Sequence, residues 1–292
     1  MIHLPIGSRL LTSAVCLVTL CLVMNNPSIH FHPDTLLQWL SFMPRLETLA
    51  INFLYLRNRD MEGQFRHTPA TTLVTLPNLH YFTFRGDTTY LEALVHQITP
   101  CPEKLEIGFA YQRTFSIPRL LSFMNARENL KFETAKFKFL SWQVSMAVYP
   151  RGEAEMCALS IMVGCFDFSW QVSSVAQFSD SLSPILSAVE HLILEHEVDS
   201  WSSEEHNVGQ NEVDRQWHKL FSFFSNVKTL RIDNGLVEAV SRSLLDDGEF
   251  PLELLPELQE LTYSGSGKTG DTFTSFIHAR QNTGRPITVT RC

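Results

Sequence analysis

The amino-acid sequence predicts an α/β fold, a leucine-rich-repeat-like solenoid with irregular repeats and a mainly parallel sheet. The first observation is a short strand phrase, which is clearest in Val227-Lys228-Thr229-Leu230-Arg231-Ile232. The second is a segment just before it, residues 217–224, whose apolar residues recur at the spacing of an amphipathic helix. The third is that the phrase recurs at intervals typical of solenoids, whose units bury their apolar faces against one another.

Each copy of the strand phrase has an apolar anchor at its fourth position. The anchors are Leu49, Phe82, Leu105, Leu192, Leu230 and Leu261. Successive anchors lie 23 to 38 residues apart, except across a gap of 87 residues between Leu105 and Leu192. In this gap we expect two or more divergent copies of the repeat, one of them near residues 130–132.

A length of 292 residues by itself suggests about two domains. The repeats instead predict one domain over residues 1–292, because a repeat array grows by stacking units rather than by adding a second core. The apolar fraction of 44% is ordinary for a folded protein. The net charge of −8, without a basic run, argues against nucleic acid and against an anionic membrane surface as partners. The six cysteines include no CxxC pair, which predicts free thiols in the cytoplasm or nucleus.

Residues 1–33 are interpreted as an N-terminal edge strand and a connector, and within them residues 10–24 have two readings. Arg9 precedes an apolar run that resembles the core of a signal peptide, although the run is shorter than the about 20 residues that span a bilayer. No small-x-small cleavage pattern follows Met24. The same run contains a repeat phrase anchored on Leu20, which favours a buried strand that stays in the mature protein.

Several further elements are expected between the strand phrases. Helices are predicted over residues 35–42, with Asp34 as N-cap, and over 90–98, 118–124 and 272–279. Residues 57–72 are expected to form a loop, and residues 195–214 a solvated acidic loop. Strands are expected within 131–163, where residues 150–153 are either a hairpin turn or a loop.

The sequence assigns no catalytic, cofactor-binding or metal-binding residue, and the protein is therefore not expected to be an enzyme. Gly265-Ser266-Gly267-Lys268-Thr269 resembles the end of a phosphate-binding loop, but Thr262 stands where that motif needs a glycine. His191 and His196 fall on opposite faces of a strand, and neither an HExxH nor a GxSxG motif is present. The alternative function is a secreted or nucleotide-binding hydrolase that uses the turn at 265–269.

The phrases at 42–49, 76–79 and 255–261 resemble the leucine-rich-repeat region of fungal F-box-type proteins, especially those of basidiomycetes, over residues 34–290. In that family an F-box docks to the adaptor of a cullin ubiquitin ligase, and the repeats hold the substrate. The sequence carries no F-box pattern after Leu4-Pro5, the one early Leu-Pro pair. The resemblance therefore implies a substrate-recognition region without its F-box, which would contact the adaptor only if an F-box lies upstream.

The outward side chains of the sheet are the predicted binding site, on the concave face of the solenoid. Alternate strand residues point to opposite faces, so Leu230 and Ile232 should lie in the core while Arg231 points outward. Both charge signs beside an aromatic residue suit a protein partner. The predicted partner-binding residues are Tyr81, Arg85, His191, Glu195, Thr229, Arg231, Asp233 and Glu260, with Thr83, Lys104, Glu106, Ile193, Thr262 and Ser264 on the same face.

Overall fold

A computed structural model of the chain describes residues 14–24, 32–53, 73–110, 112–126, 131–152, 156–197, 210–244, 254–264 and 273–292. Across these residues the fold is α/β, with eleven strands in a large, mixed and mostly parallel β-sheet. The chain divides into an N-terminal unit, residues 1–110 with 117–129, and a C-terminal unit, residues 111–116 with 130–292. The predicted loop at 57–72 and the predicted turn at 265–269 lie outside the described residues.

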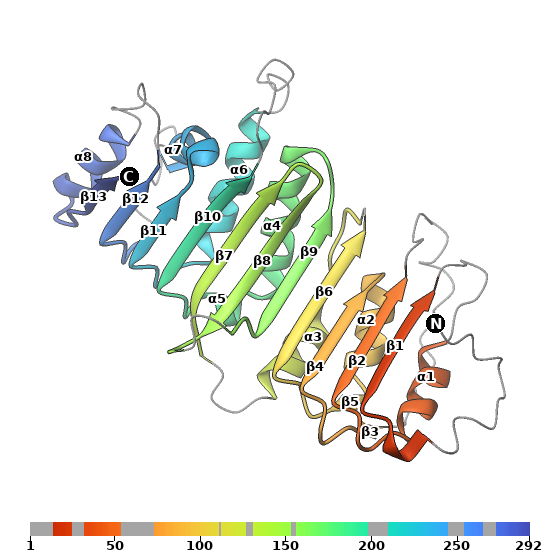
Figure 1. Cartoon of the computed structure of the whole chain (residues 1–292). Helices are drawn as coiled ribbons and strands as arrows, with labels where there is room; N and C mark the ends of the chain where they lie inside the picture. The colour runs from red at the N-terminus through yellow and green to blue at the C-terminus, as the bar shows by residue number, and fades with distance from the viewer. Residues whose placement is uncertain are drawn as a thin grey trace. The chain divides into compact units, whose positions relative to one another are not determined.

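In the described residues of the N-terminal unit, four parallel strands of the large sheet lie in the order β1-β2-β4-β6 (Figure 1). These are β1 (Thr19–Met24), β2 (Thr48–Phe53), β4 (Tyr81–Arg85) and β6 (Lys104–Ala110). The helices are α1 (Pro33–Leu40), α2 (Thr88–Val95) and α3 (Pro118–Asn125). Two short strands, β3 (Val74–Thr75) and β5 (Ile98–Thr99), pair in parallel with each other.

Where the structure describes the C-terminal unit, seven strands lie in the order β9-β8-β7-β10-β11-β12-β13. These are β7 (Phe132–Leu140), β8 (Gln143–Pro150), β9 (Leu159–Gly164), β10 (His191–Glu197), β11 (Thr229–Ile232), β12 (Glu260–Tyr263) and β13 (Thr288–Arg291). The helices are α4 (Phe168–Ser181), α5 (Ser183–Leu186), α6 (Gln210–Ser222), η3 (Asn234–Leu236), α7 (Val237–Leu244) and α8 (Thr274–Asn282). Strand β8 is antiparallel to both β7 and β9, and the pairs from β7 through β10 to β13 are parallel.

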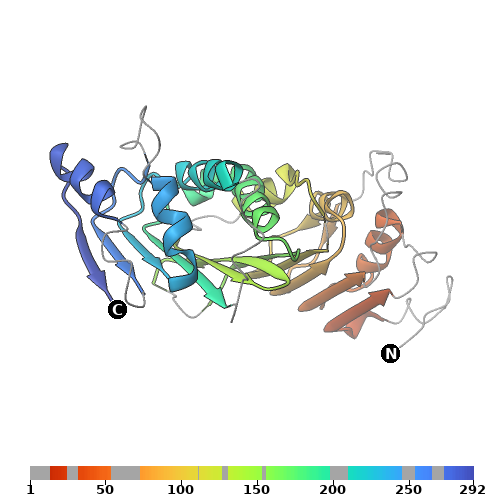
Figure 2. The same cartoon turned by 90° about the horizontal axis from the view of Figure 1, so that it is seen from above.

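The core of the C-terminal unit lies between the sheet and the helices on one of its faces. Figure 2 shows α4, α6 and α7 on the same side of these strands. The predicted alternation in β11 is confirmed, because Leu230 and Ile232 are buried and Arg231 is exposed. Trp217 and Phe221 of α6 stack on each other in this core, with ring centroids 5.6 Å apart.

A tight turn recurs directly before four of the parallel strands, and we call it the pre-strand turn. In each copy the backbone N–H of the fourth residue donates to the carbonyl of the first at 3.0 to 3.1 Å. The four turns are Met43–Leu46, Leu76–Leu79, Leu186–Val189 and Leu255–Leu258. Proline stands second in three of them, a position that needs no N–H donor and suits its fixed φ. This geometry explains the Leu-Pro-x-Leu phrases of the sequence.

Side chains from later in the chain bond to the second residue of three pre-strand turns. Asn78 Nδ2 donates to the carbonyl of Pro44 at 3.1 Å, and Asn226 Nδ2 donates to that of Ser187 at 2.7 Å. At the last turn, Arg280 Nη2 of α8 donates to Pro256 at 3.2 Å. The two asparagines are in equivalent positions, since Asn78 stands three residues before β4 and Asn226 stands three residues before β11.

Helix boundaries differ from the sequence predictions where a cap was misplaced. α1 begins at Pro33 rather than at residue 35, and the N-cap is His32, whose Nδ1 accepts from Asp34 N at 3.4 Å. Proline is favoured at the first helical position because its missing N–H has no partner there in any helix. α2 likewise begins earlier than predicted, at Thr88, because Asp87 accepts from Thr89 N at 2.7 Å.

The region between Leu105 and Leu192 is not a run of divergent parallel repeats. β7, whose start lies at the predicted copy near residues 130–132, is parallel to β10. β8 and β9 then follow as an antiparallel meander. The turn from β7 to β8 has two residues, Ser141 and Trp142, which leaves no room for the helix that a parallel crossover requires.

The predicted acidic loop at 195–214 is wrong at both of its ends. Glu195 and Glu197 belong to β10, and Glu212 and Asp214 belong to α6. Residues 198–209 lie outside the described residues. β10 extends through Glu197 because it pairs with β7 along its whole length.

The predicted N-terminal strand is present as β1, which pairs in parallel with β2 and sets Leu20 beside Leu49. The prediction of a buried strand is wrong for most of it, since Cys21 is exposed and Leu22 is half-buried. Among the described residues β1 has one neighbouring strand, β2, as expected for an edge strand.

Candidate functional site

The uncovered face of the sheet in the C-terminal unit is the candidate functional site, and we call it the open face. None of the helices in the described ranges of this unit lies on it, as Figure 2 shows. Its side chains on the parallel strands are Thr134, Lys136, Lys138, His191, Ile193, Glu195, Thr229, Arg231, Glu260 and Thr262. The strand register sets them in rows, since His191 lies opposite both Thr134 and Thr229, and Thr229 lies opposite Glu260.

Two ion pairs cross from β7 to β10 on the open face. Lys136 Nζ lies 2.6 Å from a carboxylate oxygen of Glu195, and Lys138 pairs with Glu197. Glu195, a predicted site residue, therefore already has a cation beside it. Sequence reasoning did not place either lysine in the site, because β7 and β10 become neighbours only after the chain has made β8 and β9.

Arg231 is one of two exposed charged groups among the predicted site residues of this unit, and Glu260 is the other. The register neighbours of Arg231 are Ile193 and Thr262, which carry no charge. Among the residues that the structure describes, no carboxylate forms an ion pair with it. Glu260, one row away, is also exposed. The open face thus offers a cation and an anion to a partner.

Tyr81 and Arg85 belong to β4 of the N-terminal unit and form a separate set. Lys104 Nζ lies 5.0 Å from the ring centroid of Tyr81 and 2.9 Å from Glu106 Oε1. Burial, followed by a hydrogen bond with Glu106, raises the pKa of Tyr81. Arg85 packs its side chain over Gly108, where a Cβ atom would lie 3.0 Å from Arg85 Cγ. The predicted residues therefore fall into two groups, one in each unit.

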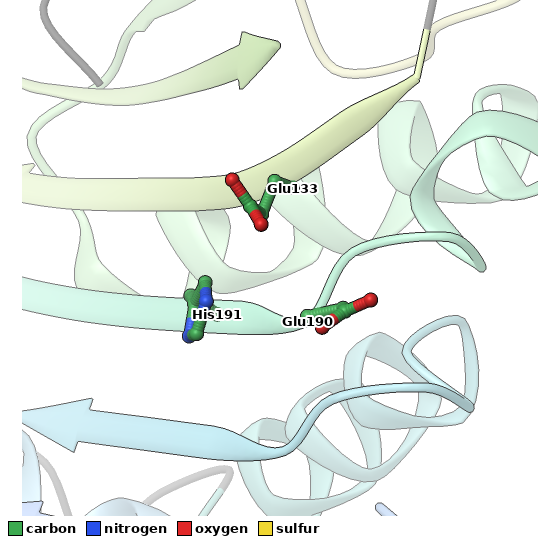
Figure 3. Close-up of side chains that lie close together, drawn as sticks. All are labelled: Glu133, Glu190 and His191. Carbon is green, nitrogen blue, oxygen red and sulfur yellow. The ribbon is translucent and has the colours of Figure 1, made fainter. Parts of the chain in front are cut away.

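A second constellation lies where β7 and β10 begin, and we call it the Glu133–Glu190–His191 cluster (Figure 3). One ligand atom from each of the three side chains lies within 4.8 Å of the others. His191 Nδ1 is 2.8 Å from Thr229 Oγ1. Sequence reasoning missed the cluster because Glu133 and Glu190 are far apart in the chain, although the start of each strand was predicted.

Basic groups flank both carboxylates of the cluster. Lys228 Nζ donates to Glu190 Oε2 at 2.7 Å, and this hydrogen bond is the main cause that lowers the pKa of Glu190. Arg151 Nε lies 3.6 Å from Glu133 Oε1, and Gly152 N donates to Glu133 Oε2 at 3.3 Å. Both glutamate side chains are 28% exposed, so solvent reaches them.

His196 lies on the helix-covered face, opposite to His191, as its odd offset along β10 predicts. Its backbone N–H donates to Asp233 Oδ2 at 3.4 Å, and burial lowers the pKa of its imidazole. Asp233, a predicted site residue, is therefore engaged at the end of β11. The two histidines do not form one site.

Comparison with known proteins leaves the chain without an assigned family. No protein-family model matches the sequence, and no curated protein matches it significantly. In the described ranges, no helix combines the length and apolar character that crossing a bilayer requires.

Proposed function

We propose that the protein is a non-enzymatic, protein-binding repeat scaffold and that the open face of the C-terminal unit receives its partner. The observation that carries this proposal is the uncovered sheet face, on which exposed Arg231 and Glu260 have the uncharged register neighbours Ile193, Thr229 and Thr262. Interfaces of this mixed character are typical of non-obligate protein complexes. The proposed location is the cytoplasm or nucleus.

The finer architecture that we propose is a leucine-rich-repeat-like solenoid with irregular repeats. Two regularities support it: the pre-strand turn recurs before four parallel strands, and asparagines three residues before β4 and β11 donate equivalent side-chain hydrogen bonds to an earlier pre-strand turn. In repeat proteins each unit mainly contacts its neighbours, so recurring contacts between consecutive units are expected. The antiparallel strands β8 and β9 are an irregular insertion in this scheme.

The open face suits a partner that lies across several strands. Neighbouring strands are about 4.8 Å apart, so side chains of one row form a continuous line. Arginine is enriched among the residues that dominate interface energies, which favours Arg231 as an anchor. Charges at the rim of such a surface change the association rate and its salt dependence more than the final affinity.

The resemblance to fungal F-box-type proteins suggests what the partner is. We propose that the repeats hold the substrate of a cullin-type ubiquitin ligase. Contact with the ligase adaptor would require an F-box, for which the sequence shows no pattern.

Affinity capture from a lysate of the native host tests the proposed binding face. The baits are the wild-type chain, Arg231→Glu on the open face, the double variant Tyr81→Ala/Arg231→Glu, and Arg215→Glu, which makes the same charge change on the exposed surface of α6. We expect Arg231→Glu and the double variant to lose partners that the other two baits retain. If Arg231→Glu retains every partner, or if Arg215→Glu loses the same ones, the open face is not the binding surface.

A further inference from the structure

We propose that the Glu133–Glu190–His191 cluster is a binding site for a divalent transition-metal ion such as Zn²⁺. The cluster shares His191 with the open face, but the inference does not rest on partner binding, because it is argued from the ligand groups of the cluster alone. Figure 3 shows the three side chains grouped there. The cluster joins two carboxylates and an imidazole, and each of these groups is a zinc ligand in proteins.

The backbone holds the two carboxylates next to each other. Glu190 N donates to the carbonyl of Glu133 at 2.9 Å, so both residues sit at the same level of the sheet. The register shift in β7 between Phe132 and Thr134 falls at Glu133, where it interrupts the strict alternation of faces. The ligand atoms lie within 4.8 Å of one another. With zinc–ligand bonds of about 2.0 to 2.2 Å, donors in a tetrahedral site are roughly 3.3 Å apart, so side-chain rotation alone could close the site.

Thr229, on a third strand, orients the imidazole of His191. The contact of 2.8 Å between Thr229 Oγ1 and His191 Nδ1 engages one ring nitrogen and leaves Nε2 as the metal ligand. Histidine ligands commonly use the second nitrogen for such a bond, which fixes both the tautomer and the orientation of the ring.

Lys228 and Arg151 fix the carboxylates and also limit the affinity of the site. Lys228 bonds to Oε2 of Glu190, which leaves Oε1 for the metal. The contacts of Glu133 with Arg151 and Gly152 are longer, at 3.6 and 3.3 Å. Hydrogen-bonded carboxylates are ordinary metal ligands. The two cations repel a metal ion, however, so we expect weaker binding than at a structural zinc site.

The ligand types select the class of ion. Mg²⁺ and Ca²⁺ favour all-oxygen ligand sets, whereas an imidazole nitrogen favours Zn²⁺ and its neighbours in the transition series. Three protein ligands also leave a fourth position for water or for a side chain of another molecule. This open position distinguishes the cluster from a closed structural site.

Calorimetric titration of the full chain with Zn²⁺ tests the proposal, with Co²⁺ absorption as a second readout of coordination. We expect one ion per chain, and at least about tenfold weaker binding in His191→Ala and in Glu190→Gln, since loss of even an outer-shell partner lowers metal affinity by about 10- to 100-fold. The matched control is Glu195→Gln, a half-buried carboxylate on the same strand whose cation is Lys136. That variant should bind Zn²⁺ as the wild type does.

Lys228→Met is a complementary variant, because it is expected to strengthen Zn²⁺ binding rather than to weaken it. Loss of the competing cation should tighten Zn²⁺ binding, and circular dichroism checks that each variant is folded. The proposal is wrong if His191→Ala binds Zn²⁺ with wild-type affinity, or if Glu195→Gln weakens binding as much as Glu190→Gln does. It is also wrong if Lys228→Met weakens binding in a folded protein.

Discussion

Arg280 places a charged group in the interior of the C-terminal unit, where the residue is 1% exposed. Its guanidinium donates to the carbonyls of Leu255 at 3.1 Å, Pro256 at 3.2 Å and Leu258 at 2.8 Å. These groups belong to the pre-strand turn before β12. Burial is the main cause that lowers the pKa of Arg280. Hydrogen bonds from a charged donor to several carbonyls offset the desolvation that such burial requires.

Replacing Arg280 with methionine should therefore destabilise the C-terminal unit through unsatisfied carbonyls rather than through lost volume. A buried acceptor left without its donor costs about 1–3 kcal/mol. The control is Arg285→Met, because the Arg285 side chain is exposed on the segment before β13. Chemical denaturation of both variants measures the difference. Equal stabilities would show that the hydrogen bonds of Arg280 contribute nothing net.

Leu230 and Arg231 are adjacent in β11 but should respond very differently to truncation. Leu230 is 1% exposed, so Leu230→Ala should cost about 2–5 kcal/mol of unfolding free energy, as for other large-to-small core changes. Arg231→Ala should cost under about 0.5 kcal/mol, as for an ordinary surface change. Urea unfolding of the two variants compares them directly. Similar losses would contradict the assignment of the two faces.

At the scale of elements, α3 takes its N-terminal cap from another helix. Ile117 at the N-cap position has no side-chain oxygen, and Glu92 of α2 accepts from the backbone N–H groups of Arg119 at 2.8 Å and Leu120 at 3.0 Å. Burial is the largest influence on this carboxyl and raises its pKa above the ordinary 4.5, although these hydrogen bonds act in the opposite direction. Glu92 thus connects α2 to α3.

The raised pKa of Glu92 determines the direction in which the stability of the protein changes with pH. A group whose pKa is raised by folding contributes stability that is fully present below its unfolded pKa and is lost as pH rises through its folded pKa. We therefore expect the wild type to gain stability relative to Glu92→Gln as the pH falls from 7 towards 4.5. Unfolding free energies of both proteins across this range measure the gain. A difference that shrinks on acidification would mean that the hydrogen bonds outweigh burial.

The strand phrases predicted the strands well because their apolar residues are close in sequence and alternate regularly. β2, β4, β10, β11 and β12 all contain a predicted anchor. Helix caps were harder to predict. α1 is capped by His32, and α3 is capped by Glu92, which belongs to another helix, α2. Neither belongs to the short list of residues that usually cap a helix, and the second is distant in sequence.

For the whole molecule, the sequence predicted a mostly parallel α/β fold but not the order of its strands. The antiparallel strands β8 and β9 separate β7 from β10 in the chain, although β7 and β10 are neighbours in the sheet. Both the ion pair of Lys136 with Glu195 and the Glu133–Glu190–His191 cluster depend on that pairing. Periodicity within a segment carries no information about which distant segment lies beside it.

The pairing of β1 with β2 gives the last prediction, which concerns the mature chain. Six residues of β1, Thr19–Met24, lie in register with β2, and Val18 O accepts from the N–H groups of Glu47 and Thr48 at 2.8 and 3.0 Å. Cleavage after Met24 would remove these partners and leave one edge of β2 unpaired. Unpaired strand edges promote association with other chains, so we expect residues 19–24 to be retained. N-terminal sequencing and intact mass of protein from the native host measure this. A mature chain that begins near Asn25 would instead indicate secretion, and its cysteines should then be examined for disulfides.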